Sequence, residues 1–341
     1  MNVSHMAREV AEIPQAAARF LDQSRPAVAK AAAALRRLDP ALLVTVARGS
    51  SDHAATYFKY AAELMAGVPV ASVGPSIASI YRRPLKLGRA ACIGISQSGQ
   101  SPDIVEMMQA AGAGGALTLA ITNHAQSPLA MASDHCLQMD AGTEHSVAAT
   151  KTFVVSVLAG LALLAEWQAD ADLRKALADL PQALEQALAL DWTPLADRLV
   201  NAKSFYVLGR GPAIAIAAET ALKGKETCGL HAEAYSAAEV LHGPSAIVHA
   251  RFPVLALGVP DAALPQLCLT AERLAGQGAE VFLTGGTAAD AVTLPSVAGL
   301  HPLAAPLVMI VSVYAMFEAL ARRRGFDPDM PPHLRKVTET V

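Results

Sequence analysis

Residues 90–103 read AACIGISQSGQSPD, and this passage fixes the class of fold more firmly than any other. The apolar run Ala90–Ile95 predicts a buried β-strand. Ser101 and Pro102 are typical of the N-cap and first residue of a helix. Three hydroxyls, an amide and a glycine therefore lie between a strand and a helix, where ligands bind in open parallel sheets.

The same order of a short β-rich run and a longer alanine- and leucine-rich stretch recurs along the chain. In the first half it predicts strands over residues 42–47, 90–95, 117–122 and 135–139, and a long helix over 150–168. In the second half it predicts strands over 204–208, 253–258, 280–284 and 291–294, and a long helix ending at 324. Such alternation indicates parallel sheets with helical crossovers, and its repetition indicates a duplicated α/β unit.

Composition excludes several classes of protein. The 341 residues are 53% hydrophobic and 17% charged, which suits two folded domains and not a disordered chain. The net charge of -3 gives no sign of a nucleic-acid partner. The four cysteines, without a C-x-x-C pair, predict reduced thiols and not a disulfide framework or a zinc site.

We expect a soluble, cytoplasmic protein without a membrane partner. The beginning of the chain lacks the apolar core of a secretion signal. The most apolar stretches, residues 153–165 and 303–317, are shorter than the roughly 20 residues that cross a bilayer, and Pro306 interrupts the second. Both are expected to be buried helices.

The 96–101 loop is a candidate phosphate site. Free N–H groups and the dipole at the start of the following helix favour an anion, and the serine hydroxyls add neutral donors. A second hydroxyl pair, Ser50 and Ser51, follows the first strand at the same sheet edge. No Walker A motif is present. The alternative interpretation is a polar turn with an ordinary helix cap.

Three other motifs are incomplete, and we expect no metal and no cofactor. Ser98 stands where a nucleophile elbow needs glycine. Ile214 stands at the third glycine position of a dinucleotide fingerprint. The segment 231–233 (HAE) lacks the P-C-x-x-C that follows in zinc deaminases.

A second candidate site lies between Glu219 and His242. Glu219, Lys223 and Glu226 are spaced by four and three residues, so they share one helix face. Such charges also form ordinary solvated faces. His242 precedes Gly243-Pro244, a rigid turn that presents its imidazole, although a lone histidine is more often structural. A carboxylate and a histidine are suited to proton transfers on a sugar.

Taken together, these segments resemble the sugar-isomerase (SIS) domain family, and specifically the isomerase half of glucosamine-6-phosphate synthase. The resemblance covers nearly the whole chain from Met6 onwards. The motifs that carry it are residues 49–54 (GSSDHA), 95–99 (ISQSG), 144–151 (EHSVAATK), 221–226 (ALKGKE), 231–235 (HAEAY), Glu239, 242–244 (HGP) and the tail 329–338 (DMPPHLRKVT).

The resemblance implies two tandem SIS units, each a five-stranded parallel sheet flanked by helices in a flavodoxin-like three-layer sandwich. It implies an N-terminal helical segment (1–30), a phosphate-binding domain (31–172), a domain with the catalytic helix and histidine loop (190–325), and a tail (326–341) that closes the active site. It also implies a homodimer.

Site roles follow from the same resemblance. Phosphate binding is carried over to the hydroxyl and amide side chains of Ser50, Ser51, Ser96, Gln97, Ser98 and Ser101. Glu226 would move a proton between C1 and C2, and His242 of the neighbouring subunit would open the sugar ring. Lys223 would take part in proton handling, and Lys336 would contact the open-chain ketose or form a Schiff base with it. Val147 and Glu219 would line the sugar site.

The expected reaction is deamination of a phosphorylated amino hexose, glucosamine 6-phosphate, to fructose 6-phosphate and ammonia. The synthase-like entry begins at Met6, which leaves no room for a glutaminase domain. Gln100 stands where the synthases usually carry glutamate, and Arg335 replaces the small residue before the tail lysine. The alternatives are an isomerising aminotransferase or phosphosugar isomerase, and a non-catalytic sugar-phosphate sensor.

Overall fold

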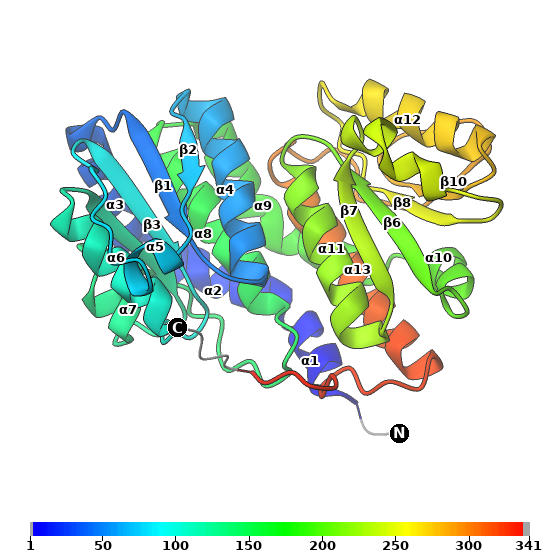
Figure 1. Ribbon diagram of the computed structural model, residues 1–341, viewed down its shortest axis with the longest axis horizontal. Helices are drawn as coiled ribbons and strands as arrows, with labels where there is room; N and C mark the ends of the chain where they lie inside the picture. The colour runs from blue at the N-terminus through cyan, green and yellow to red at the C-terminus, as the bar shows by residue number, and fades with distance from the viewer. Residues whose placement is uncertain (1–2, 337–341) are drawn as a thin grey trace. The chain divides into compact units, whose positions relative to one another are not determined.

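The computed structural model describes residues 3–336 (Figure 1). The chain divides into two compact units, each with its own parallel sheet. The first-sheet unit contains residues 12–144, 151–181 and 335–336, and the second-sheet unit contains residues 3–11, 145–150 and 182–334. The domain boundaries expected from the sequence stay a prediction. Tail residues 337–341 lie outside the described residues.

The first sheet has five parallel strands, as expected. Their order is β2 (Val70–Ser72), β1 (Leu42–Val46), β3 (Ala90–Ile95), β4 (Leu117–Thr122) and β5 (His135–Gln138). Val44 of β1 pairs with Cys92 of β3, which pairs in turn with Thr118 of β4. β3 is buried along its whole length, which explains why its six residues contain no charge.

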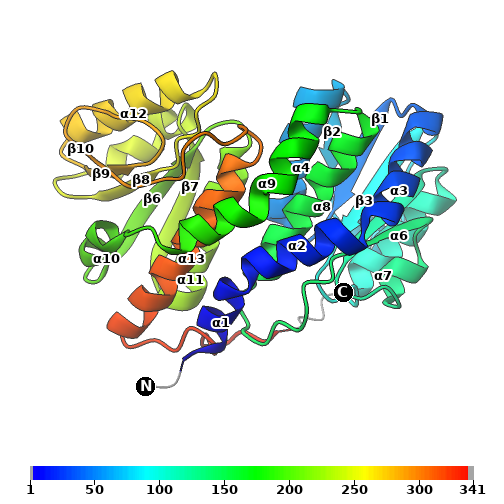
Figure 2. The ribbon, with the colours of Figure 1, turned by 180° about the vertical axis from the view of Figure 1, so that it is seen from behind.

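Helices cover both faces of the first sheet. One group packs around α8 (Lys151–Trp167) and contains α2 (Ile13–Gln23), α3 (Arg25–Leu38) and α4 (Ser50–Ala66). Figure 2 shows α2, α3 and α8 in front of the sheet. The other group contains α5 (Ser76–Ser79), α6 (Pro102–Ala113) and α7 (Pro128–Met131). Ile104, Met107 and Met108 of α6 pack against β1 and β3, so the core fixes the helix that follows the 96–101 loop.

The second sheet repeats the strand order of the first. Its parallel strands are β7 (His231–Ser236), β6 (Ser204–Gly209), β8 (Pro253–Ala256), β9 (Glu280–Leu283) and β10 (Ala291–Thr293). β6 and β8 therefore occupy the places of β1 and β3. This confirms the duplicated α/β unit predicted from the sequence.

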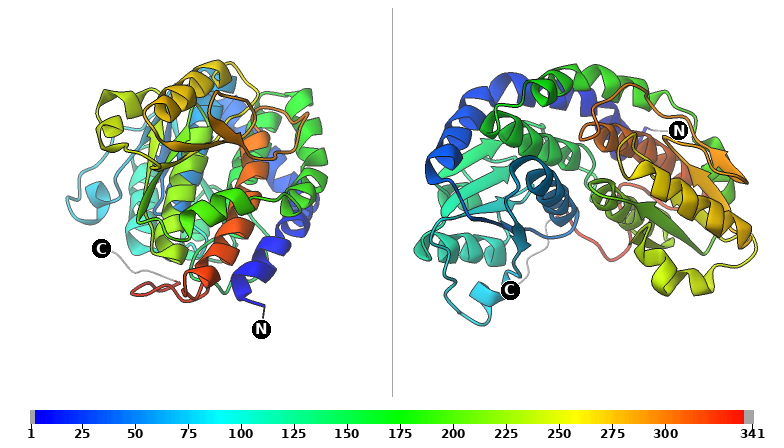
Figure 3. Two further views of the ribbon diagram at one scale, coloured as in Figure 1. Left: turned by 90° about the vertical axis from the view of Figure 1, so that its right-hand side faces the viewer. Right: turned by 90° about the horizontal axis from the view of Figure 1, so that it is seen from above.

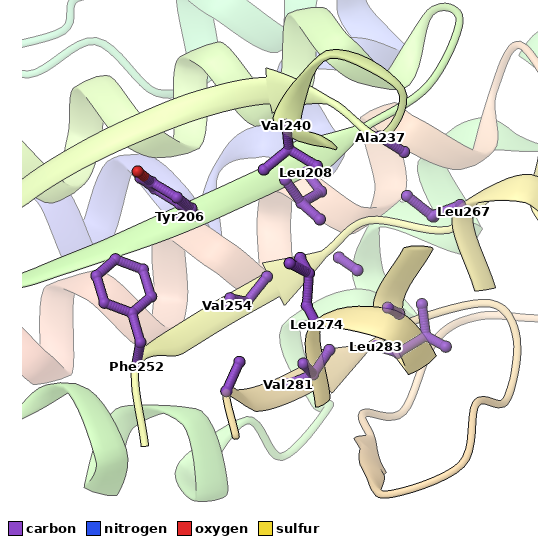
Figure 4. Close-up of a cluster of buried hydrophobic side chains, with 13 residues drawn as sticks. Tyr206, Leu208, Ala237, Val240, Phe252, Val254, Leu267, Leu274, Val281 and Leu283 are labelled. Atoms are coloured by element: carbon purple, nitrogen blue, oxygen red, sulfur yellow. The ribbon is translucent and has the colours of Figure 1, made fainter. Parts of the chain in front are cut away.

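Alternate residues of β6 point to opposite faces of the sheet and pack into two different hydrophobic clusters. Tyr206 and Leu208 join a cluster with residues of β8, β9 and α12 (Leu264–Gly276) (Figure 4). On the other face, the Phe205 ring lies 6.2 Å from the ring of Phe317 on α13 (Ala305–Arg323). Figure 3 shows α12 and α13 from two further sides. The remaining elements are α1 (His5–Ala11), α9 (Ala171–Leu188), α10 (Thr193–Leu199), α11 (Ala213–Cys228), η1 (Glu239–His242) and η2 (Pro244–Ile247).

α13 is long and apolar enough to cross a membrane by length and composition alone. It continues for six residues beyond Phe317, the end of the apolar run, to Arg323. Of its most apolar window, 78% is buried inside the protein. Burial therefore accounts for its hydrophobic character.

Candidate functional site

The 96–101 loop connects β3 to α6 in the way its sequence predicts. The Ser96 N–H donates to the Ile121 carbonyl at 3.1 Å, and the Ser96 hydroxyl accepts from the Gly99 N–H at 3.1 Å. The Ser98 hydroxyl accepts from the Gln100 N–H at 3.3 Å. Ser101 occupies the N-cap position of α6, but its side chain makes no capping hydrogen bond. The loop thus places several hydroxyls at the start of a 12-residue helix.

Gly99 is required by the shape of this loop. Its φ is 64°, and a Cβ atom there would lie 2.2 Å from the Ser127 hydroxyl oxygen. The Leu129 N–H donates to the Gly99 carbonyl at 3.0 Å, and the Asn123 N–H donates to the Gln97 carbonyl at 3.1 Å. The segment after β4 therefore fastens the loop at two points.

A cavity of about 540 Å³ opens beside this loop within the first-sheet unit. Gln97 and Ser98 line it, so it contains two of the predicted phosphate-binding residues. Gln100 also lines the cavity and supplies a neutral amide. It is the residue that differs from the glutamate expected at this position from the resemblance. Its other lining residues are Arg19, Gln23, Asn123, His124, Gln138, Asp140, Gly142, Thr143, Glu144 and Lys336.

The other predicted phosphate residues do not line this cavity. Ser50 and Ser51 begin α4, after Gly49 with a φ of 55°. Ser96 directly follows β3 and is buried, and Ser101 comes after Gln100 at the start of α6. Arg48, just before Ser50, donates from Nε and Nη2 to Asp103 Oδ2 at 3.1 and 2.8 Å. Because Asp103 is in the first turn of α6, this ion pair ties the loop after β1 to that helix.

Lys336 reaches the cavity from the tail and pairs with Glu144. Its Nζ lies 2.9 Å from Oε2 of Glu144, whose side chain is fully buried. Glu144 also accepts from the Thr152 N–H at 3.1 Å and from the Thr152 hydroxyl at 2.6 Å. The sequence predicted Lys336 as a site residue but gave Glu144 no role beyond its motif, since 192 positions separate the pair.

Asn123 and Arg19 were also missed from the sequence. The Asn123 side chain donates to the Gly142 carbonyl at 2.9 Å and accepts from the Ala141 N–H at 2.9 Å. Arg19 donates to the Asp140 and Ala141 carbonyls at 3.2 Å each. Both shape the segment after β5 by binding its backbone. No spacing pattern could have revealed contacts that are made to main-chain atoms so far along the chain.

The second cluster lies on α11 in the second-sheet unit. The side chains of Glu219 and Lys223 are fully buried, and that of Glu226 is 18% exposed. Lys223 Nζ lies 3.3 Å from Glu219 Oε1 and also binds Glu226 Oε2. The Tyr314 hydroxyl of α13 donates to Glu219 Oε1 at 3.1 Å. The three charges share one helix face as predicted, and their burial excludes the solvated-face interpretation for Glu219 and Lys223.

The electrostatics of this cluster keep the amine of Lys223 charged. Burial alone would lower the pKa of Lys223, but the carboxylates of Glu219 and Glu226 outweigh burial and raise that pKa above its usual value. The ammonium is therefore retained. Within this trio it is Glu226 that solvent reaches. Such a carboxylate is suited to accept a proton from a carbon acid.

His242 and Val147 lie elsewhere in the second-sheet unit. His242 ends η1 and is exposed, and Gly243 follows with a φ of 152°. The Tyr206 hydroxyl donates to the Pro244 carbonyl at 3.0 Å, which holds the turn. Val147 is half-buried, and its N–H donates to the Asp329 carbonyl at 3.3 Å. Among residues 3–336, no group of three or more His, Cys, Asp or Glu residues could hold a metal ion.

A family model described as the SIS domain matches residues 41–166, which include every strand of the first sheet. A crystal structure from Silicibacter pomeroyi, of a protein provisionally named a phosphosugar isomerase, is 52% identical to this chain. It aligns with a TM-score of 0.93 over 96% of this chain and 100% of its own. The chain belongs to the SIS-domain family.

Two further proteins differ in how closely they match this SIS-family chain. The glutamine–fructose-6-phosphate aminotransferase of Zymomonas mobilis is 32% identical over 311 residues, or 85% of this chain and 51% of the aminotransferase. The chain thus spans about half the length of the curated relatives it matches. The glucosamine-6-phosphate deaminase of Thermotoga maritima aligns over 99% of this chain and 100% of its own, with a TM-score of 0.79 but 20% identity. That likeness shows a shared fold alone.

Proposed function

We propose that this SIS-family protein is a phosphosugar isomerase that moves a proton between C1 and C2 of a phosphorylated hexose. The observation that carries the proposal is the α11 trio, in which buried Lys223 and Glu219 support Glu226 at the edge of solvent. The 52% identity to a protein provisionally named a phosphosugar isomerase supports the same reaction class. This is the reading that the sequence left as the alternative to deamination.

The loop after β3 would hold the phosphate group. A phosphate dianion matches the neutral hydroxyl and amide donors there and the N-terminal end of α6. Lys336 adds a positive charge to the same cavity. The phosphate supplies binding energy that does not change during the reaction, so it would anchor the sugar without carrying out chemistry.

Proton transfer would be the work of Glu226. His242 would open the ring, and Glu226 would remove the C2 proton of the aldose and return it to C1. Lys223 Nζ binds Oε2 of Glu226, which would fix the position of the carboxylate that serves as the base. We also propose that the enzyme acts in the cytoplasm as a homodimer, with His242 supplied by the partner.

A narrower proposal concerns amino sugars. The aminotransferase relatives are named for fructose 6-phosphate and glutamine, and they share 32–34% identity with this chain. Glu226 chemistry on glucosamine 6-phosphate would convert the aldose amine to a ketimine, which water would hydrolyse to fructose 6-phosphate and ammonia. This deaminase reaction uses the same proton transfer and differs in the fate of nitrogen.

A panel of hexose 6-phosphates and amino hexose 6-phosphates tests both proposals. In D2O, proton NMR should show aldose–ketose exchange with deuterium entering the sugar at C1 or C2. Ammonia release in step with ketose formation would establish deamination. If calorimetry shows sugar-phosphate binding but no member of the panel is turned over, both proposals are overturned. That result would favour the alternative of a non-catalytic sugar-phosphate sensor.

A further inference from the structure

The second-sheet unit has a cavity of its own, of about 440 Å³, at the edge where its strands end. Residues that follow β8, β9 and β10 line it, among them Pro260, Thr287 and Pro295. In the first sheet, residues that follow β3, β4 and β5 line the cavity beside the 96–101 loop. Because β8, β9 and β10 repeat β3, β4 and β5, each sheet has a cavity at the edge where parallel sheets bind ligands.

The walls of the second cavity are held by hydrogen bonds that need no ligand. The Trp192 indole N–H donates to the Pro295 carbonyl at 3.1 Å, which joins the start of α10 to the segment after β10. The buried Ser312 hydroxyl donates to the Ala187 carbonyl at 2.8 Å, which joins α13 to α9. Trp192, Pro295 and Ser312 all line the cavity. The cavity is therefore preformed, as most small-molecule sites are.

α13 begins at this cavity but does not offer its N-terminal end to an anion. A helix N-terminus attracts anions through N–H groups that have no acceptor within the helix. Ala305, the first residue of α13, lines the cavity, and the N–H groups of Ala304 and Ala305 donate to the His301 carbonyl at 2.8 and 3.0 Å. Pro306 has no N–H, and the Leu307 N–H donates to the Ala304 carbonyl at 3.1 Å. The chain itself thus caps this end of the helix.

The side chains around the cavity carry no charge. Among the described residues that line it, none is Asp, Glu, Lys, Arg or His. Trp192, Val308 and Met309 are almost fully buried and form apolar wall, whereas Thr287 is exposed and Ser296 is half-buried. An ionised ligand would lose hydration here without gaining a charged partner. An apolar ring would gain from burial, and the hydroxyls nearer to solvent can bind one polar atom of it.

We propose that this edge of the second sheet is a second binding site, for an uncharged and mainly apolar compound of one or two rings. The cavity volume lies within the range of small-molecule sites, which is about 300–1,000 Å³. The proposal goes beyond the isomerase function, whose phosphate loop belongs to the first sheet. The duplicated unit thus provides a polar site in one copy and an uncharged site in the other.

Pairs of probes that differ in charge test the ligand class. Near neutral pH, indole and 2-naphthol are uncharged, whereas indole-3-acetate and 2-naphthoate are anions of similar size. Calorimetry should give a Kd below about 1 mM for the uncharged probes, and at least about tenfold weaker binding for the anions. Equal affinities within the pairs would overturn the proposal. So would the absence of binding by both uncharged probes up to their solubility.

Methionine methyl NMR tests where the probes bind. Met309 lines the cavity, and Met330 of the same unit is 74% exposed and reports non-specific contact with apolar probes. In protein labelled with ¹³C-methyl methionine, Met309→Leu identifies the signal of Met309. The uncharged probes should shift that signal until it saturates and leave the signal of Met330 in place. An unmoved Met309 signal would place the probes elsewhere and overturn the proposal.

Filling the cavity should block the site. Val297 is half-buried in the lining, so Val297→Trp should weaken binding of the uncharged probes at least about tenfold. Val292→Trp, an exposed change on β10, should leave the affinity unchanged. Ala305→Leu serves if the melting temperature shows that Val297→Trp does not fold. Unchanged affinity in the folded filling variant would overturn the proposal.

Fructose 6-phosphate distinguishes this site from the proposed active site. It should leave the Met309 signal unmoved, and it should not compete with indole. Competition between the two would overturn an uncharged ligand class. A protein that turns over no sugar phosphate of the panel but binds indole at Met309 would overturn the isomerase and support this site.

Discussion

Lys223 and Glu219 form an ion pair in which both side chains are closed to solvent, with Nζ 3.3 Å from Oε1. Such pairs are weak evidence for stability, because removing two charges from water offsets much of their attraction. This pair has a further partner one turn along α11, the partly exposed Glu226. Its arrangement is therefore explained better by support of a working carboxylate than by stabilisation of the fold.

Removing Lys223 should destabilise the protein strongly. Lys223→Met leaves the Glu219 carboxylate buried with the Tyr314 hydroxyl but without its cation, and the expected loss is about 3–5 kcal/mol in the free energy of unfolding. Urea denaturation measures it. Lys225→Met, two positions along α11 and exposed, should change stability by less than about 0.5 kcal/mol. Similar losses for the two variants would contradict the buried pair.

The pH dependence of stability should carry the signature of Lys223. Its pKa is raised in the folded protein above the usual 10.5, so the folded state holds this proton more tightly than the unfolded chain. The resulting stabilisation is complete below pH 10.5 and is lost as pH rises through the folded-state pKa. The advantage of wild type over Lys223→Met should therefore be flat from about pH 7 to 9 and shrink above 10.5. A stability advantage of wild type that grows above that pH would contradict the raised pKa of Lys223.

Glu226→Gln should remove catalysis and leave ligand binding. The amide has nearly the same shape but cannot accept the carbon-bound proton, so kcat should fall by about 10²–10⁴-fold. Calorimetry should show that the sugar phosphate still binds, because the 96–101 loop is unchanged. Glu272→Gln, an exposed change on α12, provides the control. Substantial turnover by Glu226→Gln would remove Glu226 from the proposed mechanism.

Gly99→Ala should damage the phosphate loop. The new methyl group would meet the Ser127 hydroxyl at 2.2 Å and the Thr122 hydroxyl at 2.9 Å, and a φ of 64° is itself unfavourable for alanine. We expect weaker binding, seen as a rise in KM for the sugar phosphate and in the Kd for inorganic phosphate. Gly276→Ala, in open space at the end of α12, should leave both constants unchanged. Equal behaviour of the two variants would contradict the assigned role of the loop.

The sequence predicted the elements whose residues are uniform in character. β3 and β4 begin and end at the expected residues, because apolar runs are bounded by polar loops. The two strands it missed, β2 and β7, are edge strands. β2 has only three residues. β7 reads HAEAYS, and its polar and small residues do not form the apolar run by which the other strands were predicted.

Contacts between distant segments were beyond sequence reasoning. Spacing placed Glu219, Lys223 and Glu226 on one face, but whether that face was solvated or buried depended on α13, which supplies Tyr314. The Glu144–Lys336 pair joins the start of α8 to the tail, and neither charge has a local pattern that points to the other. Burial and long-range pairing are properties of the packed chain, so they appear only with the structure.

Mixed dimers test whether His242 acts across a subunit interface. Glu226→Gln and His242→Ala should each be inactive as homodimers. If each site combines Glu226 of one subunit with His242 of the other, a dimer of one variant with the other contains one intact site. Random mixing by co-expression makes about half of the dimers mixed, so about a quarter of wild-type activity should return. Size-exclusion chromatography with light scattering checks the dimer, and mixing Glu226→Gln with wild type controls for dilution. If His242 served Glu226 of its own subunit, no mixed dimer would contain an intact site, and activity would stay at the level of the single variants.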